Sequence, residues 1–114
     1  MSCKLVVSFS IDGTHYWPDA PKKYSEFSHP HRHLFKFILW FAVKDSDDPT
    51  TREVELWDLR YKAKTAVYSM WALNRHKVNF GSMSCEGISK ALKEKMGADS
   101  VFVGEEENLG ALVQ

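Results

Sequence analysis

Histidines 29, 31 and 33 lie within five residues of one another, and their spacing suits metal ligation from a strand. In an extended chain successive side chains alternate between two faces, so His29, His31 and His33 project to one side and Arg32 to the other. Two imidazoles at positions i and i+2 form one edge of a metal site, and a third ligand must come from elsewhere. His15 is the obvious candidate for this third ligand. A lone histidine is usually a surface or hydrogen-bonded residue, and for His29 we expect a role beside the ligands or in solvent.

The composition limits the classes of function. The chain has 114 residues, with 15 Lys and Arg and 15 Asp and Glu, so no long-range field favours nucleic acid or an anionic membrane. Two cysteines give no disulfide framework, and the apolar run 34–43 is too short to cross a bilayer. The N-terminus lacks the features of a signal peptide. We therefore expect a soluble, cytoplasmic protein with one domain over 1–114.

The elements that must position these histidines follow from local patterns. β-Branched and aromatic residues predict strands over 4–11 and 31–44, and shorter strands over 100–105 and 109–113. The segment 52–56 is also expected to re-enter the sheet. Helical spacing of apolar residues predicts helices over 57–73 and 85–96, the second with Ser84 or Ser82 as N-cap and Gly97 at its C-terminal cap.

These elements predict an α+β fold of order ββααββ, with both helices on one face of a four-stranded antiparallel sheet. The strand over 31–44 is apolar on both faces, which is typical of a sheet interior or a subunit contact. The segment 14–30 is a long loop in which prolines disfavour a helix, and loops of this length are often functional.

An ordered set of motifs along nearly the whole chain resembles the 6-pyruvoyl-tetrahydropterin synthase / 6-carboxytetrahydropterin synthase family, whose fold is the T-fold. The matching pieces are a histidine in the loop after the first strand, an HxH followed by aromatic residues, a strand-to-helix passage, small or hydroxyl residues before a Glu, and a C-terminal V-x-V-x-E. In this sequence they are FSIDGTH (9–15), HRHLF (31–35), VELWDLR (54–60), SMSCE (82–86) and VFVGE (101–105).

The resemblance implies a homo-oligomer, either a trimer, a tetramer or a hexamer, whose sheets join edge to edge into a β-barrel around a tunnel. It implies that His15, His31 and His33 bind Zn²⁺, with one coordination position left open as catalytic zinc requires. Glu105 would anchor a pterin ring, since a carboxylate can accept two parallel hydrogen bonds from such a ring, and Glu86 would be a second contact. The implied activity is a lyase acting on 7,8-dihydroneopterin triphosphate, in tetrahydropterin or 7-deazaguanine (queuosine) synthesis.

The sequence departs from the family pattern in its proton-transfer groups. The usual catalytic cysteine before the HxH is absent from the segment KYSEFS (23–28). Of the family's Asp-His pair, only the histidine has a counterpart here, His76, and the aspartate is missing. His76 and Cys85 remain as candidate catalytic residues, and His29 is a second candidate to replace the missing thiol, although Cys85 also suits packing at a helix start. The alternative is a T-fold protein that binds a pterin or purine without turning it over.

Two roles have a competing structural reading. Glu105 lies in the acidic run 105–107, and such runs are usually solvated turns. Glu86 lies in the first turn of a helix, where the helix dipole alone favours a carboxylate.

Overall fold

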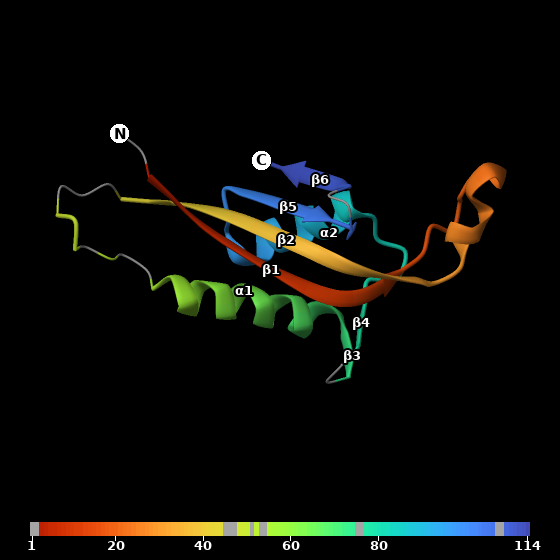
Figure 1. Cartoon of the computed structure of the whole chain (residues 1–114), viewed down its shortest axis with the longest axis horizontal. Coiled ribbons are helices and arrows are strands. Elements are labelled where there is room, and N and C mark those ends of the chain that lie inside the picture. The colour runs from red at the N-terminus through yellow and green to blue at the C-terminus, as the bar shows by residue number, and fades with distance from the viewer. Residues whose placement is uncertain (1–2, 45–47, 51, 53–54, 75–76, 107–108) are drawn as a thin grey trace.

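A computed structural model of the chain describes residues 3–44, 48–50, 52, 55–74, 77–106 and 109–114. Its elements lie in the order shown in Figure 1: β1 (Cys3–His15), η1 (Lys22–Ser28), β2 (His31–Val43), α1 (Leu56–Trp71), β3 (Ala72–Asn74), β4 (Lys77–Asn79), α2 (Cys85–Met96), β5 (Ser100–Gly104) and β6 (Gly110–Val113).

The strands form one six-stranded sheet in the order β3-β4-β1-β2-β5-β6, in which β1 and β4 are parallel and the other pairs antiparallel. The α+β class agrees with the prediction from the sequence, but the prediction of a four-stranded, purely antiparallel sheet was wrong. The two additional strands, β3 and β4, have three residues each. Strands this short carry too little alternation to be recognised from the sequence. The sequence predicted a strand over 52–56, but Glu55 is the N-cap of α1 and Leu56 begins the helix. The described part of this segment therefore does not form a strand.

Strand β1 continues four residues beyond its predicted end and carries His15 as its last residue. It pairs with β2 along its whole length, from Cys3 opposite Val43 to His15 opposite His31. Gly13 lies inside this strand and does not end it. A Cβ at Gly13 would be 2.8 Å from the Phe80 ring, so glycine is needed there for a close approach rather than for a turn.

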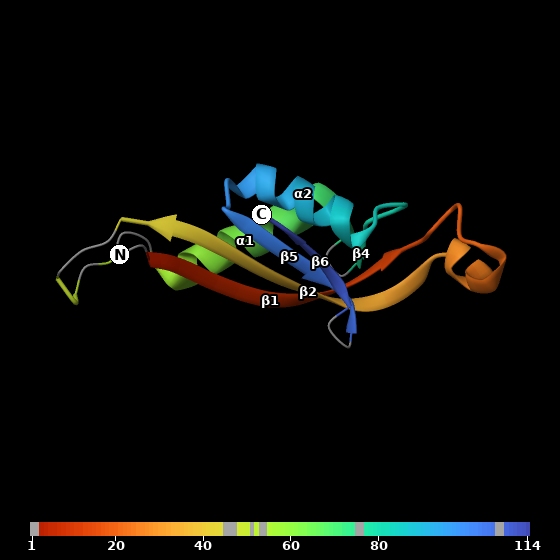
Figure 2. The same cartoon turned by 90° about the horizontal axis from the view of Figure 1, so that it is seen from above.

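Both helices cover the same face of the sheet, as the sequence predicts (Figure 2). Helix α2 begins after Ser84, whose hydroxyl accepts a hydrogen bond from the Gly87 amide, and it ends at Gly97 with a φ of 65°. These bounds agree with those expected from the cap residues. The core between the helices and the sheet consists of Val7, Phe9, Ile11, Phe35, Phe37, Leu39, Leu59, Ala63, Ala66, Val67, Val78, Phe80, Ile88, Leu92, Ala98, Val101 and Val103.

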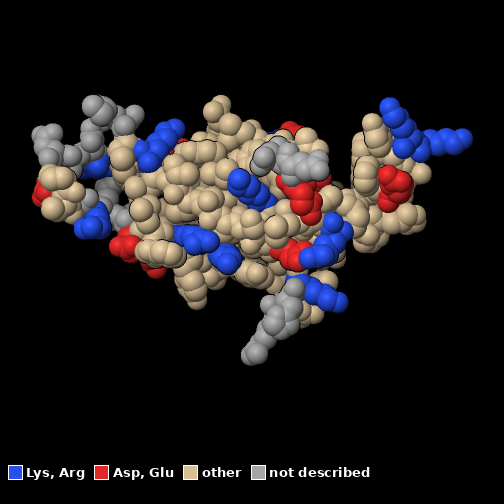
Figure 3. Space-filling view, viewed as in Figure 1, with Lys and Arg blue, Asp and Glu red and all other residues tan. Residues whose placement is uncertain are grey.

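The opposite face of the sheet is not covered by the part of the chain that the structure describes. Val6, Leu34 and Leu112 lie on this face, and about half of the surface of each is exposed. Within the described residues of a single chain, β2 is therefore fully buried on one face only. Among the residues that the structure describes, no helix has the length and apolar character needed to span a membrane. On the face in Figure 3, described positive and negative side chains are interspersed, in keeping with the balanced composition.

The far ends of β1 and β2 extend beyond the helices and carry η1 at one end of the long axis (Figures 1 and 2). The molecule is elongated, with extents of 56 × 30 × 23 Å. We expected no helix between residues 14 and 30, but Lys22–Ser28 forms a short 3₁₀ helix. Pro21 precedes this helix as its N-cap, a position where a missing amide hydrogen costs little.

Candidate metal centre

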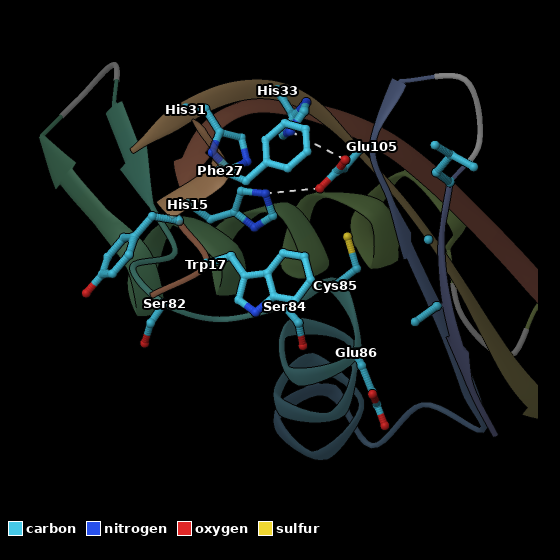
Figure 4. Close-up of a pocket in the computed structure, with 14 residues that line it drawn as sticks. His15, Trp17, Phe27, His31, His33, Ser82, Ser84, Cys85, Glu86 and Glu105 are labelled. Carbon is cyan, nitrogen blue, oxygen red and sulfur yellow. Dashed lines mark ion pairs between the residues drawn. The ribbon is translucent and has the colours of Figure 1, made fainter. Parts of the chain in front are cut away.

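The structure brings together the three histidines singled out in the sequence, and Glu105 joins them. His15 ends β1 opposite His31, and His33 follows on the same face of β2. One ligand atom from each of the four side chains lies within 4.8 Å of all the others. The four side chains converge at one wall of the cavity in Figure 4. Arg32 is on the other face, where its guanidinium pairs with Asp12.

Each of the three imidazoles is held through its Nδ1 atom. Nδ1 of His15 lies 3.1 Å from the carbonyl oxygen of Met83, and Nδ1 of His31 lies 3.0 Å from that of His29. Nδ1 of His33 lies 2.6 Å from Oε2 of Glu106. Carbonyl and carboxylate oxygens only accept hydrogen bonds, so each Nδ1 carries the proton. The Nε2 lone pairs are left available, which is the usual state of metal-binding histidines.

The Nε2 atoms of His15 and His33 face the Glu105 carboxylate. Oε1 of Glu105 is 3.0 Å from Nε2 of His15, and Oε2 is 3.4 Å from Nε2 of His33. Nε2 of His15 is buried and makes no hydrogen bond of acceptable geometry, despite this short distance. An unprotonated nitrogen beside a carboxylate oxygen places two acceptors in contact, which a cation between them would resolve. Three imidazoles and a carboxylate are a donor set that suits zinc and similar divalent ions.

Burial and hydrogen bonding set the charges of these groups. The His15 ring is buried, and this burial lowers its pKa below the ordinary value, which favours neutral imidazole. The Leu34 backbone N–H, together with the hydrogen bond from His33, lowers the pKa of Glu106 to about 2. At neutral pH the cluster therefore offers a neutral His15, and the Glu106 carboxylate beside His33 is ionised. Neutral imidazole is the form that binds metal.

A cavity of about 520 Å³ opens beside the cluster, a size suited to a small organic ligand. One wall comes from the ends of β1 and β2, another from the start of α2, and a third from the turn between β5 and β6 (Figure 4). The lining consists of His15, Tyr16, Trp17, Phe27, His31, His33, Ser82, Ser84, Cys85, Glu86, Glu105, Leu109, Gly110 and Ala111.

Aromatic rings from the 16–30 segment form one side of this cavity. Trp17 stacks on Tyr24 at a centroid distance of 6.5 Å, and Tyr24 stacks on Phe27 at 6.0 Å. Phe27 in turn contacts the His31 ring at 5.4 Å. Of the segment 23–28, where the resemblance expects a thiol, Phe27 is the residue that lines the cavity. Trp17 and Phe27 together give the cavity flat apolar surfaces beside the histidines.

The other predicted site residues are less close to the histidines. Cys85 lines the cavity at the start of α2, and burial raises the pKa of its thiol to about 11. Glu86 is on the same wall but points away from the histidines in Figure 4, and its exposed carboxylate lies 3.6 Å from Nζ of Lys90. His76 lies outside the described residues.

Sequence reasoning missed Glu106. In the acidic run 105–107 it looks like a solvated turn residue, and its partner His33 is 73 positions away in the chain. Two features point to Glu106. It follows Glu105 directly in the sequence, and it comes just after a strand that pairs with the strand carrying the HxH motif.

Comparison with known proteins identifies a fold. No protein-family model matches the sequence, and no curated protein does. Among solved structures, the chain is similar to the 6-pyruvoyl tetrahydropterin synthase of Caenorhabditis elegans, with a TM-score of 0.67 and 14% sequence identity. The match covers 100% of this chain and 96% of the nematode chain. At this identity the comparison establishes the architecture alone: the chain has the fold of a 6-pyruvoyl tetrahydropterin synthase.

Proposed function

We propose that the chain binds zinc through His15, His31 and His33 and acts as a 6-pyruvoyl/6-carboxytetrahydropterin synthase-like lyase on 7,8-dihydroneopterin triphosphate. The product would belong to tetrahydropterin or 7-deazaguanine synthesis. The observation that carries the proposal is the convergence of three imidazoles whose Nδ1 atoms are all engaged, beside a cavity of about 520 Å³. The shared fold with the nematode synthase supports it.

Each wall of the cavity has a proposed task. Bound zinc would supply Lewis acidity that acidifies the hydroxyls of the substrate side chain. Glu105 would accept hydrogen bonds from the ring N–H and amino groups, with Glu86 as a second contact. The exposed ring of Trp17 would stack on the planar ligand.

The proton-transfer group is proposed to be Cys85 or His76. Cys85 is the thiol that lines the cavity, but its raised pKa means that it is protonated at neutral pH when no metal is bound. A nearby cation would favour its thiolate.

A second function is favoured by Phe27. This ring occupies the cavity wall in the segment where the resemblance expects a catalytic thiol. The alternative proposal is therefore a protein that binds a pterin or purine at the same site without turning it over.

The proposed partners follow from the same site. The ligand is a pterin or purine-like small molecule, and the chain assembles as a homo-oligomer, a trimer, tetramer or hexamer, with sheets joined edge to edge into a barrel. The apolar side chains exposed on one face of the sheet support this assembly. Nucleic acid and membranes are not proposed as partners, and the proposed location is the cytoplasm.

Metal analysis tests the site. Protein purified without a histidine tag should contain stoichiometric zinc, and His15→Ala should lose most of it because one of the three imidazoles is gone. His29→Ala is the matched control, since the contact of His29 in the cluster is through its backbone carbonyl. Absence of zinc, or equal zinc in wild type and His15→Ala, would refute the site.

Turnover then separates enzyme from binder. Incubation with 7,8-dihydroneopterin triphosphate should release inorganic triphosphate if the chain is a lyase. Cys85→Ser should reduce kcat if the thiol transfers the proton. Tight binding with no triphosphate released would support the alternative.

A further inference from the structure

The Glu106 carboxylate bridges two consecutive residues of β2. Oε1 accepts a hydrogen bond from the Leu34 backbone N–H at 2.7 Å, and Oε2 accepts one from Nδ1 of His33 at 2.6 Å. The glutamate lies just after β5, so this side chain ties the β5–β6 turn to the strand that carries two of the three histidines.

The contact with Leu34 extends the sheet beyond its last backbone pair. Strands β2 and β5 pair from Lys36 opposite Gly104 to Trp40 opposite Ser100. Amides on one edge of a strand recur every second residue, so the next ones lie at positions 34 and 42. The Glu106 carboxylate accepts from Leu34, and at the other end of β5 the Asp99 carboxylate accepts from Ala42. Asp99 therefore provides an internal control for the backbone part of the role of Glu106.

Glu106 also contacts the His33 ring, whereas Asp99 makes no such contact with a histidine among the described residues. The His33 ring lies between two carboxylates, with Glu106 at 2.6 Å from Nδ1 and Glu105 at 3.4 Å from Nε2. A neutral imidazole has one proton, and the carboxylate that receives it decides which nitrogen is free. The shorter contact is to Glu106, which leaves Nε2 as the ligand atom. Without Glu106 the proton would pass to Nε2 and bond to Glu105, which would block metal binding.

We infer that Glu106 is a positioning residue for the metal centre: it holds the His33 ring with the proton on Nδ1 and directs Nε2 toward Glu105. This inference rests on the proposed metal function of the cluster. Partners of this kind orient the ring and raise its basicity as a ligand.

Zinc affinity, measured by competition with a chromogenic chelator, tests the inference in Glu106→Gln, Glu106→Ala and Asp99→Asn. Glutamine can accept one of the two hydrogen bonds but not both, and alanine neither, so both Glu106 variants should bind zinc roughly 10–100-fold more weakly. Asp99→Asn should bind zinc as the wild type does.

A second readout does not depend on metal. Long-range ¹H–¹⁵N NMR of the metal-free chain at pH 8 reports the histidine tautomers. His33 should carry its proton on Nδ1 in the wild type and in Asp99→Asn, and on Nε2 in Glu106→Ala.

Each result bears on one claim. A wild-type chain that binds no zinc overturns the proposed function, and this inference with it. Zinc binding that is equal in the wild type and both Glu106 variants, or an unchanged His33 tautomer in Glu106→Ala, overturns the inference alone. Equal loss of zinc in Asp99→Asn and Glu106→Gln also overturns it, because the effect would then be one of sheet structure.

Discussion

His15 links the metal chemistry to the stability of the chain. Only 8% of its surface is exposed, and this burial lowers the pKa of the ring in the folded state. As pH falls below about 6.5, the unfolded chain takes up a proton at this residue before the folded chain does. The unfolded state then binds more protons, so the free energy of unfolding decreases as pH falls.

We expect this loss in the metal-free chain between pH 7 and 5, at no more than about 1.4 kcal/mol per pH unit for one proton. Urea denaturation in the presence of EDTA measures it, and His15→Gln should flatten the pH dependence. Glu106 affects the free energy of unfolding in a separate pH range. Its stabilising contribution is present above its ordinary pKa of 4.5 and is lost as pH falls toward 2. A His15→Gln chain with the same slope as the wild type would contradict the assignment.

Residue spacing predicted part of the cluster. The alternation of side chains on a strand was sufficient to place His31 and His33 on one face and Arg32 on the other. The same reasoning could not find Glu106, because its role depends on the pairing of β5 with β2 and on a bond between residues 73 apart. The contact of Phe27 with His31 likewise depends on how η1 folds back.

The β5–β6 hairpin positions both glutamates, and it depends on a close approach of two glycines. Gly104 and Gly110 are opposite each other, and a Cβ at Gly110 would be 2.2 Å from the Val103 carbonyl oxygen and 2.4 Å from the Gly104 Cα. Both atoms belong to the backbone and cannot move aside without shifting the strand.

Gly110→Ala should therefore destabilise the chain by on the order of 1–3 kcal/mol and weaken zinc binding, because the turn that carries Glu105 moves. Gly87→Ala is the matched control. The nearest atom to its Cβ would be 3.6 Å away, in a flexible methionine side chain, and alanine in a helix should stabilise by about 0.5–1 kcal/mol. Thermal unfolding and chelator competition measure both effects. A Gly110→Ala chain with wild-type stability would refute the close approach.

Helices and strands whose ends are marked by cap or turn residues could be predicted, whereas elements without such residues at their ends could not. Helix α2 has Ser84 before it and Gly97 after it, and its predicted bounds were correct. β1 was predicted too short because Asp12 and Gly13 look like a turn, although pairing with β2 keeps them extended. Tertiary pairing overrode the local signal there.

Among the residues with a described position, one face of the sheet is uncovered and β6 is an edge strand. Leu112 lies on this edge strand, and 51% of its surface is exposed. If the edge and face join other copies, a lysine there should disfavour the contact without disturbing the core. Sedimentation velocity should show an oligomer for the wild type and mainly 13.1 kDa chains for Leu112→Lys, with an unchanged circular dichroism spectrum. A monomeric wild type would contradict the proposed assembly.

Zinc K-edge X-ray absorption of the untagged protein tests the central proposal most directly. The three proposed histidine ligands predict three imidazole nitrogens around the metal, with an oxygen ligand in the open fourth position. All four are expected at distances of about 2.0–2.2 Å. A sulfur ligand at about 2.3 Å would instead place Cys85 on the metal. A spectrum without imidazole scattering, or one that His15→Ala leaves unchanged, would contradict the site.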